Sequence, residues 1–123
     1  MATAPIWDNL PSECRSRPQW VLWSHRVVHG RKTKVPLDAY GHNASTTAPH
    51  TWAHLDEVRK TFEAGTGAGV GFVFTRQAGI SGVDLDHCRD SSTGEVDAWA
   101  RTIIAQLDSY TEISPSGAGV HIL

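Results

Sequence analysis

The chain has 123 residues, of which 40% are hydrophobic and 20% are charged, and these ordinary proportions argue against bulk disorder. Its net charge of −2 at pH 7 argues against a generally adhesive nucleic-acid binder, and no apolar stretch approaches the length of a membrane span. The only two cysteines, Cys14 and Cys88, lack CxxC spacing, so we expect no disulfide framework and a reducing cytoplasm as the compartment.

The first third of the chain is predicted to end in a β-hairpin. Residues 1–17 contain prolines that interrupt regular structure, so they are predicted to be an irregular lead-in to one domain at 18–123. Residues 19–28 are rich in Trp and Val, which is typical of a strand. The turn residues 29–31 then lead into a returning strand at 32–37.

The middle of the chain is predicted to contain a helix and two strands. A polar loop at 38–49 precedes a helix at 49–65, where apolar residues recur at steps of three and four. These apolar residues are Trp52, Leu55, Val58 and Phe62. The apolar, glycine-spaced residues 69–75 predict a buried strand, which the turn at 76–79 connects to a second strand at 80–86.

The last third is predicted to hold a second helix and two more strands. An amphipathic helix is expected at 96–107, with apolar positions at Val96, Trp99, Ile103, Ile104 and Leu107. A strand at 110–113, a loop at 114–119 and a strand from 120 onward follow. Helices that alternate with pairs of strands indicate the α+β class. Because the chain ends inside this apolar strand, we expect it to be a fragment of a longer domain.

The tryptophans are predicted to be core residues. Four of the five fall on apolar faces of the predicted elements: Trp20, Trp23, Trp52 and Trp99. Because they fall on apolar faces, we expect them to pack in the core rather than to serve as platforms for base stacking.

Charge is distributed unevenly along the chain. Residues 1–34 carry six basic and two acidic side chains, whereas residues 35–123 carry five basic and eleven acidic ones. This pattern suits a protein that holds phosphates with one part and metal ions with another, although a solvated basic hairpin is equally compatible with it. Lys34 and its same-face neighbour Lys32 are the candidate phosphate contacts. Edge-strand lysines that deter aggregation are the alternative interpretation.

Two aspartates mark a candidate metal site. Asp84 and Asp86 are two positions apart on a predicted strand, so their carboxylates project from one face while Val83 and Leu85 point into the core. Such close like charges repel unless a cation lies between them. Carboxylate oxygens suit Mg²⁺ or Mn²⁺, which in turn bind substrate phosphates. An Asp-x-Asp pair alone also fits a solvent-facing edge strand or the metal site of a glycosyltransferase.

The loop after the 110–113 strand is a candidate anion site. Its small residues allow backbone N–H groups to approach an anion closely, and its serines add hydroxyl donors. The candidate residues are Ser114, Ser116, Gly117 and Gly119. His121 follows on the face opposite Val120, within reach of a phosphate bound there. The alternative is a flexible Ser-Gly turn followed by a structural histidine.

Five motifs in this order resemble a known domain family. They are Trp20-Val21-Leu22-Trp23, Lys32-Thr33-Lys34-Val35-Pro36, Gly69-Val70-Gly71-Phe72-Val73-Phe74, Gly82-Val83-Asp84-Leu85-Asp86-His87-Cys88 and Tyr110-Thr111-Glu112-Ile113-Ser114-Pro115-Ser116-Gly117. The series resembles the N-terminal bifunctional primase/polymerase domain of phage and plasmid replication proteins, within the archaeo-eukaryotic primase superfamily. The resemblance extends from about Pro18 to Leu123.

The resemblance implies an RRM-like sheet with an added N-terminal α/β unit, here incomplete at the C-terminus. The implied activity is metal-dependent, template-directed synthesis from nucleoside triphosphates on a single-stranded DNA template. Asp84 and Asp86 match the family's metal-binding motif, and Gly119-Val120-His121 matches the motif whose histidine contacts the incoming nucleotide. The resemblance also implies a third acidic motif on a later strand, which no position of this chain matches; Glu112 is not assigned to it.

The family further implies a replicative helicase as partner and a cytoplasmic location in a bacterial or phage-infected cell. A non-catalytic nucleotide- or DNA-binding remnant of such a domain is the first alternative. A glycosyltransferase that uses its Asp-x-Asp pair for a nucleotide-sugar metal is a more distant one, since it gives no role to the basic hairpin.

Overall fold

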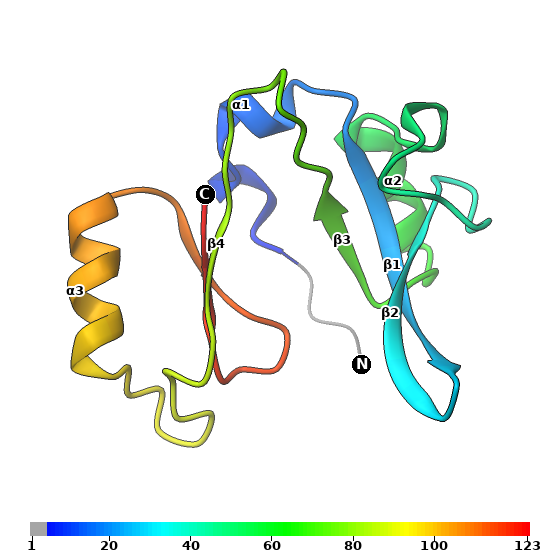
Figure 1. The fold of residues 1–123 in the computed structure, drawn as a ribbon. Helices are drawn as coiled ribbons and strands as arrows, with labels where there is room; N and C mark the ends of the chain where they lie inside the picture. Colours follow the sequence, from blue (N-terminus) through cyan, green and yellow to red (C-terminus); the bar gives the residue numbers. More distant parts are fainter. Residues whose placement is uncertain (1–4) are drawn as a thin grey trace. The chain divides into compact units, whose positions relative to one another are not determined.

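The computed structural model describes residues 5–123, which form two compact units that meet in the sequence at Val73 and Phe74 (Figure 1). Each unit combines helix with a three-stranded antiparallel sheet, so the predicted α+β class is confirmed. The RRM-like arrangement that the resemblance implies stays a prediction. No helix among the described residues is both long and apolar enough to cross a membrane.

The sheet of the first unit has the strand order β2-β1-β3. The strands span Trp20–Val28 (β1), Arg31–Leu37 (β2) and Gly69–Phe72 (β3), close to three of the predicted strands. β1 and β2 are joined by the two-residue turn His29-Gly30, and both residues have positive φ, 50° and 75°. Two successive positive φ values match the right-handed twist of the flanking strands, so this turn fixes the hairpin register.

The predicted helix at 49–65 is shorter than expected. A 3-10 turn at Pro49–Thr51 (η2) is followed by extended residues, and helix α2 begins only at Leu55 and runs to Glu63. The chain is extended at Ala53 because Ala53 and Trp20 exchange two backbone hydrogen bonds, both 2.9 Å long. His54 and Glu57 then form a reciprocal capping box that starts α2. Trp52 therefore precedes the helix.

The first unit has its core between α2 and the sheet. Leu22 on β1 and Val58 on α2 are fully buried, and Leu55 and Phe62 extend this apolar face of α2. The lead-in predicted as irregular contains a 3-10 turn at Trp7–Asn9 (η1) and a one-turn helix at Ser12–Arg15 (α1). It is ordered by packing, since the Trp7 ring meets the Phe62 ring edge-on. Residues 1–4 of the predicted lead-in lie outside the described residues.

The sheet of the second unit has the order β4-β6-β5. Its strands are short: Val83–Leu85 (β4), Thr111–Ile113 (β5) and Val120–Ile122 (β6). The strand predicted at 80–86 is thus reduced to three residues, and it pairs with β6 rather than with β3. The six-residue loop between β5 and β6 is closed by the Ser114 N–H, which donates to the Gly119 carbonyl at 2.9 Å.

Helix α3, Ala98–Leu107, covers one face of the second sheet. Its Ala100, Ile103 and Ile104 pack against a buried cluster that contains Leu85, Val120 and Ile122. The helix begins two residues later than predicted, because Val96 forms an antiparallel bridge with Arg89. Because successive side chains of a strand point to opposite faces, the residues that alternate with Leu85, Val120 and Ile122 lie on the face of the sheet away from α3.

The expectation of four core tryptophans is only partly met. Trp20 is buried and donates from its indole N–H to the Cys14 carbonyl at 3.0 Å. Trp23 and Trp52 are half-buried. Trp99 is 50% exposed, because α3 presents Ala100 and the two isoleucines to the sheet and leaves Trp99 on its outer side.

Candidate functional site

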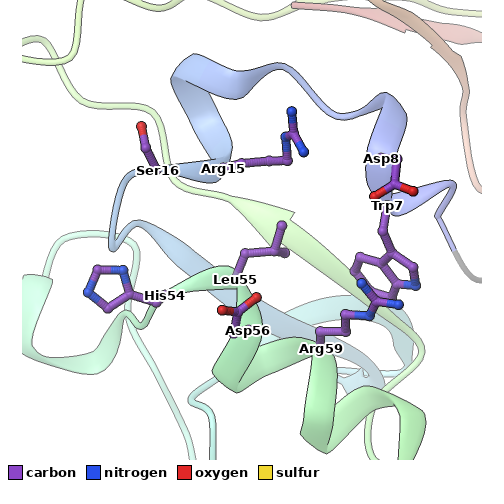
Figure 2. A pocket seen from close by; sticks show the side chains of 8 residues that line it. All are labelled: Trp7, Asp8, Arg15, Ser16, His54, Leu55, Asp56 and Arg59. Atoms are coloured by element: carbon purple, nitrogen blue, oxygen red, sulfur yellow. The ribbon is translucent and has the colours of Figure 1, made fainter.

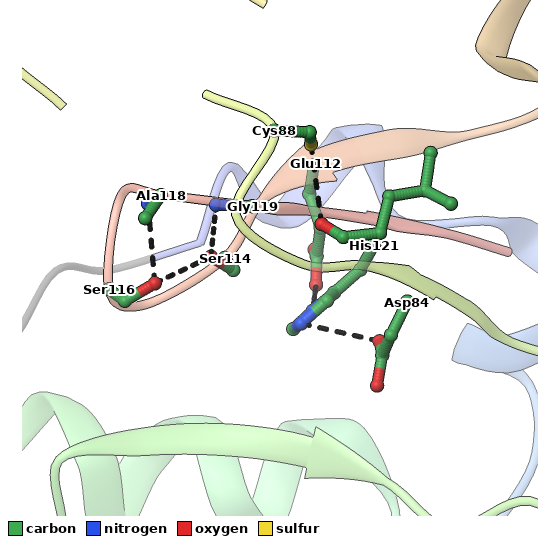
Figure 3. Close-up of polar contacts among 9 residues, drawn as sticks. Asp84, Cys88, Glu112, Ser114, Ser116, Ala118, Gly119 and His121 are labelled. Atoms are coloured by element: carbon green, nitrogen blue, oxygen red, sulfur yellow. Dashed lines mark hydrogen bonds and ion pairs between the residues drawn. The ribbon is translucent and has the colours of Figure 1, made fainter. Parts of the chain in front are cut away.

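Three polar side chains form a row across the second sheet, on the face away from α3. The strand register places Asp84 opposite His121, and His121 opposite Glu112 on the other side. The Nε2 atom of His121 lies 3.4 Å from Oδ1 of Asp84, and its Nδ1 atom lies 3.2 Å from Oε1 of Glu112 (Figure 3). Val120 and Ile122 are buried on the other face, so the predicted orientation of His121 is confirmed.

Glu112 is the residue that orients the histidine. A hydrogen bond from His121, opposed by partial burial and reinforced by the Tyr110 hydroxyl, lowers the pKa of the Glu112 carboxyl. An ionised carboxylate only accepts hydrogen bonds, so Nδ1 of His121 carries the hydrogen and donates it to Glu112. On the other oxygen, Glu112 accepts from the Tyr110 hydroxyl at 2.7 Å. Burial and this acidic neighbour raise the pKa of Tyr110. The imidazole is thereby fixed with Nε2 toward Asp84.

Asp84 and Asp86 are suited to hold a divalent cation together with a substrate. Asp84 is on β4, Asp86 follows it directly, and both are exposed, whereas Leu85 between them is buried. Among residues 5–123, no three His, Cys, Asp or Glu side chains gather closely enough to enclose a metal ion. This donor set fits Mg²⁺ and Mn²⁺, since Mg²⁺ is usually bound by one or two carboxylates, with water and substrate phosphates as the remaining ligands.

The Ser-Gly loop is preorganised by its own hydrogen bonds. The Ser114 hydroxyl accepts from the Gly119 N–H at 3.1 Å, and the Ser116 hydroxyl accepts from the Ala118 N–H at 3.2 Å. The two hydroxyl oxygens lie 3.0 Å apart, so one of them donates to the other. Together with the N–H groups of Ser114 and Gly117, which donate to loop carbonyls, four backbone N–H groups of the loop are thus already used inside it. One serine hydroxyl hydrogen remains to be donated outward.

This loop is attached to the chain that follows Asp86. The Ala118 carbonyl accepts from the N–H groups of Cys88 at 2.9 Å and Arg89 at 3.0 Å. The Arg89 guanidinium also donates to the Gly117 carbonyl at 2.8 Å. His87, with a positive φ of 53°, makes the sharp turn that permits this contact. The loop and the aspartate pair are therefore held in a fixed relation.

Gly119 occupies the tightest point of this contact. A Cβ atom at this position would lie 2.5 Å from the Leu85 carbonyl oxygen and 3.5 Å from Cα of Asp86. Real Cβ atoms do not approach a backbone oxygen so closely, so a side chain here would force the strand backbone to shift. The residue is therefore glycine because the loop touches the backbone of the strand that carries the two aspartates.

The structure brings most of the predicted site residues together and adds supporting residues that the sequence did not indicate. Asp84, Asp86, His121 and the loop residues Ser114, Ser116, Gly117 and Gly119 all lie in the second unit, around β4 and β6. Tyr110 and Glu112 had one recognisable feature, their spacing of two on a strand, which puts both on one face. The supporting role of Arg89 had no comparable indication.

The two candidate lysines belong to the first unit. Lys32 and Lys34 are exposed on β2, and the ammonium group of Lys34 lies 4.5 Å from the centroid of the Trp23 ring. Their contact with a phosphate stays a prediction.

The first unit also contains a cavity of about 340 Å³ next to the start of α2 (Figure 2). It is lined by two cations, Arg15 and Arg59, and by two carboxylates, Asp8 and Asp56. Arg59 is already engaged, since it pairs with Glu63 at 2.5 Å and lies 4.9 Å from the Trp7 ring centroid. The balanced charges give this cavity no preference for an anion, and we assign it no function.

Most of this chain is similar to part of a known phage protein. No family model matches the chain. Among curated proteins, it is 38% identical over 106 residues to a protein of Nitratiruptor phage NrS-1 that is named DNA primase-polymerase. The match covers 85% of this chain and 14% of the phage protein, so the chain corresponds to a small part of that relative's length.

Proposed function

Because this chain belongs to the DNA primase/polymerase family of phage and plasmid replication proteins, we propose that its second unit binds the incoming nucleoside triphosphate for template-directed DNA or RNA synthesis. The observation that carries the proposal is the row Asp84–His121–Glu112 beside the attached Ser-Gly loop. A histidine oriented by a carboxylate, next to an exposed aspartate pair, provides both a cationic donor and metal ligands for a triphosphate.

In the proposed mechanism, Asp84 and Asp86 would hold Mg²⁺ or Mn²⁺. When bound, such an ion neutralises phosphate charge and lowers the pKa of an attacking hydroxyl. Removing the charge repulsion between substrate phosphates and the two carboxylates is the first requirement for binding at this exposed face. The aspartates therefore select a metal-bound triphosphate over a free one.

In its imidazolium form, His121 carries a hydrogen on both ring nitrogens: Nδ1 would donate to Glu112, and Nε2 would donate to a triphosphate oxygen. The free hydroxyl hydrogen of the Ser114–Ser116 pair would donate to the same phosphates. Gly119 allows the loop to lie close to the backbone of Leu85 and Asp86, and Gly117 adopts the positive φ of 77° at the end of the loop's turn. Lys34, with Lys32 beside it, would contact phosphate or template from the first unit.

The whole enzymatic activity is a proposal of the same kind. We propose nucleoside triphosphates and a single-stranded DNA template as substrates, with primer synthesis in phage or plasmid replication as the reaction. A replicative helicase as partner and a cytoplasmic site of action follow from the resemblance, and we retain both as expectations.

Primer synthesis tests the function directly. This chain, and a version extended at its C-terminus by the following coding sequence, are incubated with a single-stranded template, labelled nucleotides and Mn²⁺. We expect labelled product that depends on the template in at least the extended version. Product from the extended version alone would show that this chain is the nucleotide-binding part of a larger domain. No product from either, despite metal-dependent nucleotide binding, would favour the non-catalytic remnant.

A further inference from the structure

The end of the β1–β2 hairpin is a two-stranded ribbon without support from a third strand. β3 pairs only with Trp20 to Trp23 of β1, so from Ser24 onward β1 has β2 as its one neighbour (Figure 1). All ten residues from His25 to Lys34 are exposed. A ribbon exposed on both faces contributes little to the core, so its sequence is free to serve a contact.

This ribbon is strongly cationic. Arg26, Arg31, Lys32 and Lys34 are four of the eleven basic residues of the chain, and residues 25–34 contain no acidic one. Within residues 5–123, no carboxylate lies in salt-bridge distance of these four cations. The rest of the chain carries a net negative charge, so the excess of positive charge in this ribbon contrasts with the net charge of −2 of the whole chain. Such a concentration of cations without carboxylate partners complements a polyanion.

The two faces of the ribbon differ. The register places Lys32 and Lys34 on the same face as Trp23 and His25, because His25 is opposite Lys34 and Val27 is opposite Lys32. The rings of Trp23 and His25 meet edge-on, with centroids 5.3 Å apart, and Lys34 lies over the Trp23 ring. The other face carries Arg26 and Arg31 without an aromatic side chain. Cations beside aromatic rings are the combination that binds single-stranded nucleic acid through phosphate contacts and base stacking.

The Trp23 ring is held in place by the adjacent strand. A Cβ atom at Gly69 on β3 would lie 2.6 Å from three atoms of the indole, so the ring rests directly on the glycine backbone. Trp23 therefore has a fixed orientation at the base of the ribbon, and it loses little conformational freedom when a base stacks against its exposed part. Lysines that only protect an edge strand would need neither this aromatic pair nor cations on both strands.

We propose that the ribbon at residues 25–34, with Trp23 at its base, is an arm that binds the backbone of single-stranded DNA. The inference rests on the proposed function for its biological meaning, since the template is the natural occupant. It adds to that function a template-binding surface in the first unit, made by Arg26, Arg31, Lys32 and Lys34 together with Trp23.

The test is the binding of a fluorescein-labelled oligothymidine, measured by anisotropy in EDTA and without nucleotide, over about 50 to 200 mM salt. Replacing Arg26, Arg31, Lys32 and Lys34 together by glutamine is expected to weaken binding about tenfold or more at low salt. The slope of log affinity against log salt should become shallower by about 0.7 for each phosphate that the variant no longer neutralises. In a separate variant, Trp23→Leu should weaken binding while leaving that slope unchanged.

A matched control changes the net charge equally. Arg15, Lys60, Arg76 and Arg101 are exposed cations outside the ribbon, and their joint replacement by glutamine should leave the affinity within about twofold of the parent chain. Equal losses in both quadruple variants, or no loss in the ribbon variant, would overturn the proposal. The proposal would also be overturned if the parent chain did not bind the oligonucleotide. The same holds if the parent chain bound anionic phosphatidylglycerol vesicles more tightly than the oligonucleotide. Because metal and nucleotide are absent, this result is independent of nucleotide binding in the second unit.

Discussion

Joint replacement of Asp84 and Asp86 by alanine is expected to abolish Mn²⁺-dependent binding of a nucleoside triphosphate. Both carboxylates are exposed, Asp84 on β4 and Asp86 directly after it, so their joint removal takes away the two proposed hard oxygen ligands for a cation that bridges to phosphate. At least a hundredfold loss of affinity is expected, which is about 2.7 kcal/mol. Calorimetric titration with a non-hydrolysable triphosphate, in Mn²⁺ and in EDTA, measures the effect.

The fold should survive this change, because neither side chain contributes to the core between α3 and the sheet. Circular dichroism and the thermal transition of the variant check that expectation. The replacement of Asp8 and Asp56 by alanine is the matched control: it removes the same charge from two exposed positions of the first unit. Undiminished Mn²⁺-dependent binding in the Asp84/Asp86 variant would contradict the assignment of the pair as metal ligands.

Replacement of His121 by alanine should weaken triphosphate binding by roughly 10- to 100-fold, even with Mn²⁺ present. The expected loss corresponds to one hydrogen bond from the imidazole to a charged phosphate oxygen, worth about 1.5–3 kcal/mol. The same calorimetric titration gives the affinity. Metal binding without nucleotide should be retained, since Asp84 and Asp86 are unchanged in this variant.

Glu112 provides a graded test of the same prediction. Glu112→Ala removes the acceptor of the His121 Nδ1 hydrogen, so it should lower nucleotide affinity by part of the loss expected for His121→Ala. Glu112→Gln retains an amide oxygen as acceptor, so its nucleotide affinity should be close to that of the parent chain. The ¹⁵N chemical shifts of the His121 ring report which nitrogen carries the hydrogen. If Glu112→Ala left both the ring shifts and the nucleotide affinity unchanged, Glu112 would not be the residue that positions His121.

The position of the site was largely predictable because it depends on alternation along single strands. That Asp84 is exposed next to the buried Leu85, and that His121 lies on the face opposite Val120, follow from the two-residue period of a strand, whereas the shared face of Asp84 and Asp86 stays a prediction. That Glu112 meets His121 depends instead on the pairing of β5 with β6, which the six-residue loop sets. Register between strands is not encoded in the alternation of either strand alone, and so this contact was visible only in the structure.

Other differences have the same origin in contacts between distant residues. The apolar period from Trp52 to Phe62 continues through Ala53, but the pairing of Ala53 with Trp20 keeps that residue extended and delays α2 to Leu55. The Ser-Gly composition of 114–119 indicated free N–H groups for an anion. The serine hydroxyls accept from two of these groups instead, which composition alone does not reveal.

The central claim is that the face carrying Asp84, Asp86 and His121 holds a metal-bound triphosphate. Paramagnetic broadening by Mn²⁺ in a ¹H–¹⁵N spectrum, recorded with a non-hydrolysable triphosphate, locates the ion on the chain. We predict that the amide signals of residues 84–87 and 119–121 broaden first. Broadening centred elsewhere, or broadening of these residues that persists in the Asp84→Ala, Asp86→Ala variant, would contradict that claim.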